Sequence, residues 1–152
     1  MSLIQIAYAV RRWVLAVTGW PTRGVKVALF NAAGEVLLVR NGYGETAAFV
    51  LPGGGVGWRE SPEAAARREV MEEVGCRIDS LRLAAVYRSL AEGRRDTIHL
   101  FAGETSDTPR IDGWEVIEAG FFAPDRLPPA ASLATTRRIA EVIGGGPYPR
   151  AW

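Results

Sequence analysis

The sequence predicts a single α/β domain, and three observations support this: its length, its composition and the alternation of two periodicities. The chain has 152 residues, which fits one domain of ordinary size with its own core. Hydrophobic residues make up 48% and charged residues 23%, as in folded globular proteins and unlike disordered chains. Runs rich in β-branched residues are interspersed with segments of helical periodicity, so strands and helices are expected to share that core.

The predicted strands follow one another along most of the chain. Two β-branched runs, 25–30 and 35–40, flank the turn sequence Asn31-Ala32-Ala33-Gly34, which is typical of a β-hairpin. A short third strand, 49–51, stops at Pro52. Three later strands are expected at 81–90, 97–104 and 118–122, the first two joined by residues 92–96.

Two helices are predicted within the domain. The first follows a glycine-rich loop and begins at Ser61-Pro62-Glu63, which supplies a cap, a proline for the first position and an acid for the first turn. It runs from 62 to about 74, where Gly75 can form a left-handed end. The second, 133–143, stops at three successive glycines. These elements define a domain over 23–146, followed by a short tail, 147–152.

Residues 1–22 are interpreted as an N-terminal helical extension. Arg11 and Arg12 interrupt its apolar run, which is therefore far too short to span a membrane. These charges lie in the middle of the segment, unlike those of a secretory signal, so we expect a cytoplasmic protein. The apolar positions recur at helical spacing and favour an amphipathic helix that covers the core or forms the face of a homodimer: Leu3, Ile6, Ala7, Val10, Trp13, Val14 and Val17.

Charge and rare residues restrict the chemistry that the chain can perform. The net charge is +1, too small to predict binding to a nucleic-acid backbone. Cys76 is the only cysteine and His99 the only histidine, which excludes internal disulfides, multi-cysteine zinc sites and two-histidine metal sites. Carboxylates, arginines and backbone groups remain as the candidate functional groups.

Three glutamates of the first predicted helix share one face. Taking about 100° per residue from Glu69, Glu72 lies at about 300° and Glu73 at about 40°. Like charges at this spacing destabilise an isolated helix, so their clustering suggests a bound cation. Oxygen ligands without histidine or cysteine favour hard ions such as Mg²⁺ or Mn²⁺.

The glycine-rich loop before this helix favours a phosphate ligand near that cation. Glycines let the backbone approach ions and phosphates closely, and a helix start adds partial positive charge. The loop lacks the Gly-Lys-Ser/Thr ending of a nucleoside-triphosphate P-loop. Gly42, Gly44 and Ala47 match a dinucleotide fingerprint only by chance, because strand 49–51 leaves no room for the helix it requires.

The residues from Gly54 to Cys76 resemble the Nudix box, G-x5-E-x7-R-E-U-x-E-E-x-G-U, where U is a bulky aliphatic residue. Every invariant position matches, and Cys76 is the one departure, at the final U. Cysteine is a small hydrophobe when buried, so this departure affects packing and not chemistry. The order of the surrounding elements agrees with the Nudix family over about 25–143. The resemblance implies a mixed β-sheet between helices, and hydrolysis of a nucleoside diphosphate linked to another group with Mg²⁺ or Mn²⁺.

The resemblance also implies roles for individual residues. Glu69, Glu72 and Glu73 correspond to the metal ligands, to which the carbonyl of Gly53 can add another. Arg68 and Glu60 would orient these carboxylates. Four further residues are candidates for substrate contacts: Gly54, Gly55, Trp58 and Arg40.

Two questions remain open in the sequence. A box glutamate, or Glu115 or Glu118 before the last strand, could be the general base, with Glu92 and Glu104 less favoured. Alternation along the strand favours Glu118, because Glu118 would then share a sheet face with Gly120 and Phe122. The substrate could be a dinucleotide, a nucleotide sugar such as ADP-ribose or a nucleoside triphosphate. The alternatives are a nucleotide sensor without catalysis and a pyrophosphohydrolase of RNA 5′ ends.

Overall fold

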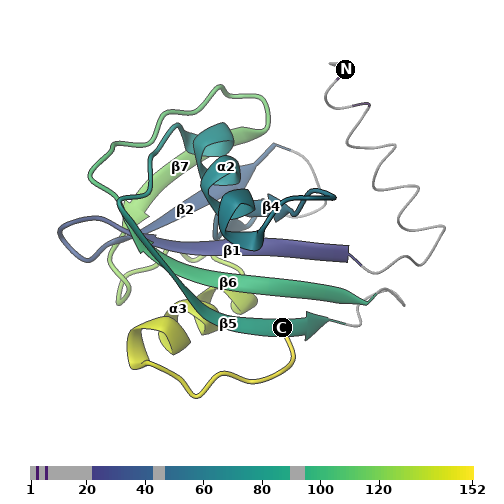
Figure 1. The fold of residues 1–152 in the computed structure, drawn as a ribbon. Coiled ribbons are helices and arrows are strands. Elements are labelled where there is room, and N and C mark those ends of the chain that lie inside the picture. Colours follow the sequence, from purple (N-terminus) through teal and green to yellow (C-terminus); the bar gives the residue numbers. More distant parts are fainter. Residues whose placement is uncertain (1–2, 4–5, 7–21, 43–46, 90–94) are drawn as a thin grey trace.

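The computed structural model describes residues 3, 6, 22–42, 47–89 and 95–152, and the predicted helix at 3–17 lies almost wholly outside them. The described elements, labelled in Figure 1, match most of the predicted ones to within three residues. They are β1 (Thr22–Phe30), β2 (Val36–Asn41), β3 (Phe49–Val50), β4 (Gly53–Gly55), α2 (Pro62–Val74), β5 (Ser80–Ser89), β6 (Asp96–Glu104), β7 (Val116–Phe122) and α3 (Leu133–Gly144).

The strands form one mixed sheet with β1 near its centre. Strand β1 pairs in parallel with β6 and antiparallel with β2 and β4. Beyond β6, the sheet ends at β5. On the other side of β1, strand β2 pairs antiparallel with both β3 and β7. The expected hairpin of β1 and β2 is present, but the two strands share only the pair Phe30 and Val36, because β4 pairs with the first half of β1 instead.

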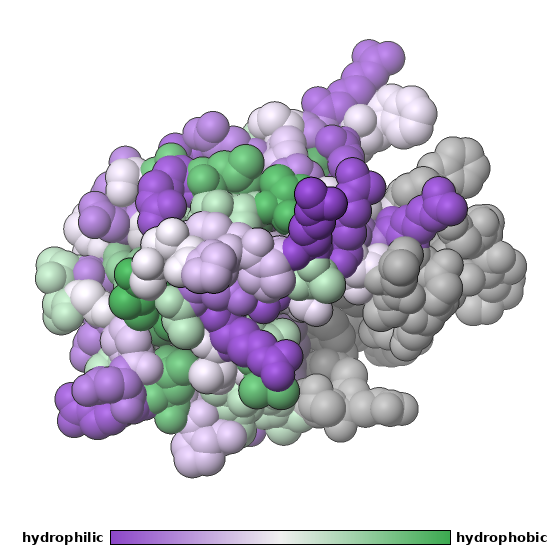
Figure 2. Space-filling view, turned by 90° about the horizontal axis from the view of Figure 1, so that it is seen from below, coloured by the Kyte–Doolittle hydropathy of each residue, from purple (hydrophilic) through white to green (hydrophobic). Residues whose placement is uncertain are grey.

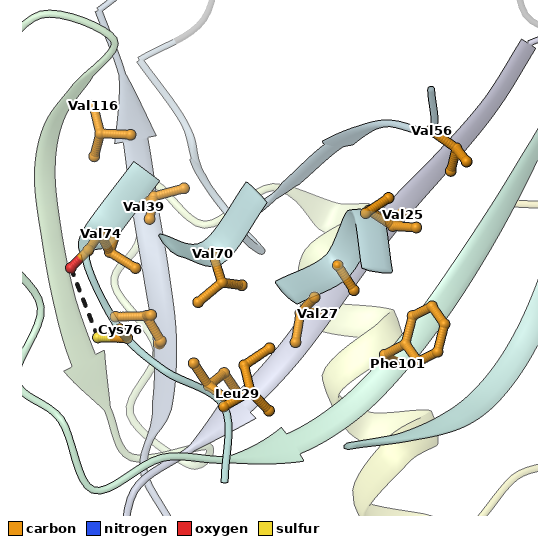
Figure 3. Close-up of a cluster of buried hydrophobic side chains, with 14 residues drawn as sticks. Val25, Val27, Leu29, Val39, Val56, Val70, Val74, Cys76, Phe101 and Val116 are labelled. Atoms are coloured by element: carbon orange, nitrogen blue, oxygen red, sulfur yellow. Dashed lines mark hydrogen bonds between the residues drawn. The ribbon is translucent and has the colours of Figure 1, made fainter. Parts of the chain in front are cut away.

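Helices α2 and α3 lie on opposite sides of this sheet (Figure 1). On the α2 side, Val70 and Val74 of the helix pack against Val25, Val27 and Leu29 of β1, as Figure 3 shows. Cys76 is fully buried in the same cluster. Cys76, at the last aliphatic position of the G-x5-E-x7-R-E-U-x-E-E-x-G-U pattern, therefore packs as a small hydrophobic residue.

On the α3 side, Ile139 and Val142 pack on Leu38, Leu100 and other buried residues of the sheet. Seen from this side in Figure 2, exposed hydrophobic groups are broken up by polar ones. Each face of the sheet thus has its own apolar core, and the side on which a strand residue points decides which helix it meets.

Two features differ from the expected element boundaries. The glycines 53–55, expected as a loop, form strand β4, because their backbones pair with residues 24–26 of β1. The last residues, expected only as a tail, lie along β5, where Arg88 N–H donates to the carbonyl of Arg150. Trp152 packs edge-on against Tyr87, so this segment joins the core on the α3 side.

Candidate active site

Helix α2 is anchored so that its acidic face, formed by Glu69, Glu72 and Glu73, turns toward β4. Ser61 caps its start by accepting a hydrogen bond from Ala64 N–H, and Gly75 ends it with a φ of 66°, as the sequence predicts. Ala66, Val70 and Val74 are fully buried against the sheet. This burial fixes the rotation of the helix about its axis, and the box glutamates project beside the glycine strand.

Strand β4 must consist of glycine where it meets this helix and β1. At Gly53, φ is 154°, and a Cβ there would overlap the carbonyl of Val25. A Cβ on Gly54 would overlap the carboxylate of Glu69. The absence of side chains therefore lets the carboxylate of Glu69 lie directly on the backbone of β4.

Substituting Gly54 with alanine is expected to displace the carboxylate of Glu69 and to weaken Mn²⁺ binding by about 10-fold, as other losses of ligand positioning do. Electron paramagnetic resonance of free Mn²⁺ measures this affinity without any substrate. Gly144→Ala is the matched control, because a Cβ there meets nothing within 4 Å. Equal Mn²⁺ affinity in the two variants would show that Glu69 does not need this close approach.

Arg68 ties the acidic face to the glycine strand. Its Nε and Nη2 donate to the two carboxylate oxygens of Glu60 at 2.7 and 2.9 Å, and Nη2 also donates to the carbonyl of Gly55 at 2.9 Å. Its Nη1 lies 2.9 Å from Oε1 of Glu69 and 3.2 Å from Oε2 of Glu72. Glu60 in turn accepts Gly57 N–H. Arg68 and Glu60 thus hold helix, loop and strand in one network.

Glu73 and Glu69 are carboxylates held in a poorly solvated position. Burial, partly opposed by Lys26, raises the pKa of Glu73 to about 8, although its Oε2 accepts Gly53 N–H at 3.2 Å. Burial also raises the pKa of Glu69, with neighbouring Arg68 acting against it. The charge of Glu115 raises both pKa values further. The raised pKa values show that negative charge on these carboxylates is unfavourable in the region between α2 and the residues before β7.

The chemistry of these donors fits a hard divalent cation. Anionic oxygens crowd one small region, and a cation there would relieve their repulsion. No three described histidine, cysteine, aspartate or glutamate side chains form a ready-made ligand cluster. Arg68 contacts both Glu69 and Glu72. Cation binding is therefore expected to draw these two carboxylates away from the guanidinium.

The raised pKa of Glu73 predicts how metal-free stability depends on pH. Between about pH 4.5 and about pH 8 the folded state keeps a proton on Glu73 that the unfolded state has lost. The free energy of unfolding must then fall as pH rises through this window. Glu73→Gln should flatten that decline in urea titrations at pH 5 to 8 with excess chelator. An unchanged slope in the variant would contradict the burial of an ionisable Glu73.

The two loop candidates for the general base point in different directions. Glu115 acts electrostatically on both Glu69 and Glu73. Glu118 forms an ion pair with Arg40, whose guanidinium lies 5.7 Å from the ring centroid of Phe49 in the core on the α3 side. Glu118 does share its face with Phe122, as expected, but this face is the one opposite α2. The structure thus brings Glu115, and not Glu118, toward the acidic face.

A β-bulge interrupts β7 beside these two residues. Arg40 pairs with Glu118, but Asn41 pairs with Val116, so Ile117 is an extra residue in β7. The extra residue breaks the alternation, and Val116 packs in the core on the α2 side while Glu118 lies on the other side. Gly42 N–H donates to the carbonyl of Glu115 at 2.9 Å, which fixes the backbone at this point.

The other predicted site residues are distributed as follows. Gly54 and Gly55 lie in β4 beside the acidic face, whereas Arg40 is paired on the α3 side. The side chain of Trp58 projects into solvent with 88% of its surface exposed. Glu104 ends β6, where it accepts a hydrogen bond from Ser80. Glu92 lies outside the described residues.

Sequence reasoning missed Lys26. Its Nζ donates to the carbonyl of Leu51 at 3.0 Å, and it interacts electrostatically with Glu73 and Glu69. Burial lowers the pKa of Lys26, and the two carboxylates oppose that shift. One signal was present in the sequence, since Lys26 interrupts the apolar strand 25–30.

The chain resembles known proteins in sequence and in fold. The model of the NUDIX domain matches residues 20–142. The chain belongs to the Nudix family. A crystal structure of a MutT Nudix hydrolase from Burkholderia pseudomallei superimposes with a TM-score of 0.68 and 31% identity, over 80% of this chain and 95% of that chain.

Two curated relatives of this Nudix chain carry names that describe activities. A putative 8-oxo-dGTP diphosphatase from Bacillus subtilis (strain 168) is 34% identical over 108 residues, 70% of each chain. An RNA pyrophosphohydrolase from Rhodospirillum rubrum is 42% identical over 64 residues, 41% of this chain and 38% of the relative. With the NUDIX match, these similarities identify the chain as a Nudix-type pyrophosphohydrolase. No helix among the described residues of this enzyme is long and apolar enough to cross a membrane.

Proposed function

We propose that this Nudix enzyme hydrolyses a pyrophosphate bond in a nucleoside diphosphate linked to another group, and that it requires Mg²⁺ or Mn²⁺. The observation that carries the proposal is the acidic face of α2 against the glycine backbone of β4. There, Gly53 N–H binds Glu73, and Gly54 leaves room for Glu69. Glu69, Glu72, Glu73 and the carbonyl of Gly53 would hold the cation.

The reaction joins water to a phosphorus atom and breaks the bridging P–O bond. When bound, the cation neutralises phosphate oxygens and lowers the pKa of a coordinated water. The protein contributes position: burial of Val70 and Val74 fixes α2, and Arg68 links that helix to Glu60 and Gly55. A rigidly held set of carboxylates lowers the cost of organising the site when substrate binds.

In this proposal, Glu115 accepts the proton of the attacking water. It precedes β7, acts electrostatically on Glu69 and Glu73, and its backbone is held by Gly42. Glu115 is half-buried, and a carboxylate is a suitable base when the acidity of the water has been raised. The departing phosphate keeps the bridging oxygen and the electron pair of the broken P–O bond, and it leaves as an anion.

The substrate proposed here is a small nucleotide. The name of the Bacillus subtilis relative describes action on a modified nucleoside triphosphate, and this relative aligns over a larger share of the chain than the RNA pyrophosphohydrolase does. A net charge of +1 also gives little attraction for an RNA backbone. The chain keeps every box carboxylate, which disfavours a sensor without catalysis.

A substrate panel tests this proposal directly. The panel includes 8-oxo-dGTP, canonical nucleoside triphosphates, ADP-ribose, dinucleoside polyphosphates and a 5′-triphosphorylated RNA oligonucleotide, each with Mg²⁺ or Mn²⁺. Chromatography identifies the nucleotide product, and malachite green detects phosphate after pyrophosphatase treatment. Cleavage of a small nucleotide in preference to the RNA supports the proposal. Preferential cleavage of the RNA would replace it with the 5′-end activity.

A further inference from the structure

Lys26 is the only lysine among the 18 basic residues of the chain, and its charge interacts with Glu69 and Glu73 of the acidic face. It is located on β1, whose neighbouring residues Val25 and Val27 are buried under α2. The Lys26 backbone is paired with Gly53 in the sheet. The only lysine of the chain thus belongs to the strand that pairs with the glycine strand of the site.

Three contacts connect residues 26 and 27 of β1 to residues 51–53. Lys26 Nζ donates to the carbonyl of Leu51 at 3.0 Å. Val27 N–H donates to the carbonyl of Pro52 at 2.9 Å, and Lys26 pairs with Gly53. The first of these is the one contact made by a side chain, so it can be removed by mutation while both backbone contacts remain.

The Leu51 carbonyl needs this partner. Leu51 is 1% exposed, and a buried carbonyl without a hydrogen bond is unfavourable enough to move its peptide group toward another donor. Two residues later, Gly53 has little room to move, because β1 packs against it and its N–H binds Glu73. A displaced Leu51 would therefore disturb the backbone that presents Gly53.

We propose that Lys26 is a positioning residue for the cation site: its hydrogen bond to Leu51 fixes residues 51–53, so that Gly53 offers its N–H to Glu73 and its carbonyl to the cation. This inference rests on the proposed function of the same residues. It assigns Lys26 a contact with the backbone and none with the substrate. Both an ammonium and a neutral amine can donate the bond, so the role depends on the donor and its reach.

Mn²⁺ affinity separates this role from a purely electrostatic one. Lys26→Met keeps the length of the side chain and removes the donor, whereas Lys26→Arg keeps a donor and a positive charge. Loss of a group that positions a ligand is expected to weaken Mn²⁺ binding by about 10- to 100-fold. Loss of a positive charge beside Glu69 and Glu73 would, by itself, tighten Mn²⁺ binding.

The experiment titrates Mn²⁺ into the full-length wild type, Lys26→Met and Lys26→Arg, with free Mn²⁺ followed by electron paramagnetic resonance and folding by circular dichroism. We expect Lys26→Met to bind Mn²⁺ more weakly than the wild type does. Lys26→Arg should bind Mn²⁺ more tightly than Lys26→Met does. In protein labelled with lysine that carries 13C only at Cε, the single lysine gives one Cε signal, which Mn²⁺ should broaden. If the methionine variant does not fold, a folded arginine variant still decides, and its expected affinity lies within 10-fold of wild type.

Several results would overturn the inference. One is a folded Lys26→Met variant that binds Mn²⁺ at least as tightly as the wild type does. Another is a Lys26→Arg variant whose Mn²⁺ affinity is no higher than that of Lys26→Met. The third is a lysine signal that Mn²⁺ does not broaden. Failure of the proposed function has a different signature, in which the wild type binds Mn²⁺ but cleaves no member of the substrate panel. A wild type that binds no Mn²⁺ would overturn both.

Discussion

Glu73→Gln is expected to lower turnover by at least about 100-fold while the fold stays intact. Glu73 is half-buried and accepts the N–H of Gly53, so the substitution keeps a hydrogen-bond acceptor but removes a proposed anionic ligand. Charge neutralisation at the transition state then weakens, and so does cation binding. Steady-state kinetics with Mg²⁺ and a Mn²⁺ titration measure the two effects separately.

Glu63→Gln is the matched control for this prediction. Glu63 lies in the first turn of the same helix, where it contacts Arg67 at 3.4 Å on the exposed surface. Its substitution removes one negative charge from α2 without touching the acidic face, and turnover should stay within a few-fold of wild type. A Glu73→Gln enzyme with native activity and native Mn²⁺ affinity would show that Glu73 is not a ligand.

Glu115→Gln should lower turnover by about 100- to 10,000-fold, the range expected when a general base is lost. Mn²⁺ affinity should change much less than turnover, because Glu115 acts on the box glutamates through its charge and is not itself a proposed ligand. The contrast with Glu73→Gln is the informative part, since a ligand variant is expected to lose both properties. The pH profile of the residual activity should also lose the limb that reports ionisation of the base.

Glu118→Gln provides the control, because Glu118 lies two strand positions from Val116 but pairs with Arg40 on the opposite side of the sheet. It should retain turnover within a few-fold of wild type. If Glu115→Gln is equally active, the base is a box glutamate, or a metal-bound hydroxide reacts without one. A large loss in Glu118→Gln alone would contradict the placement of the two residues.

The acidic helix was predictable because its signals are local. Ser61, Pro62 and Gly75 mark its ends, and a helix of known period fixes which residues share a face. The structure confirms both ends. The fixed spacing from Gly54 to Cys76 also indicated the family that the NUDIX match then showed.

The parts that sequence reasoning missed depend on distant backbone. Strand β4 has no side-chain pattern, and its strand geometry comes from pairing with β1. Alternation correctly groups Glu118 with Phe122, but it does not tell which helix covers that face, and the bulge at Ile117 is invisible in the pattern. Lys26 donates to the carbonyl of Leu51, a contact between residues 25 positions apart that no local pattern indicates.

Cation dependence is the most direct test of the central claim that the glutamate face of α2 supports pyrophosphate hydrolysis. The measurement follows product formation from the best substrate of the panel with Mg²⁺ or Mn²⁺, and again in excess chelator, for wild type and Glu73→Gln. The account predicts turnover by the wild type with a cation, none above background in chelator, and restoration when the cation is returned. Full turnover in excess chelator would contradict it.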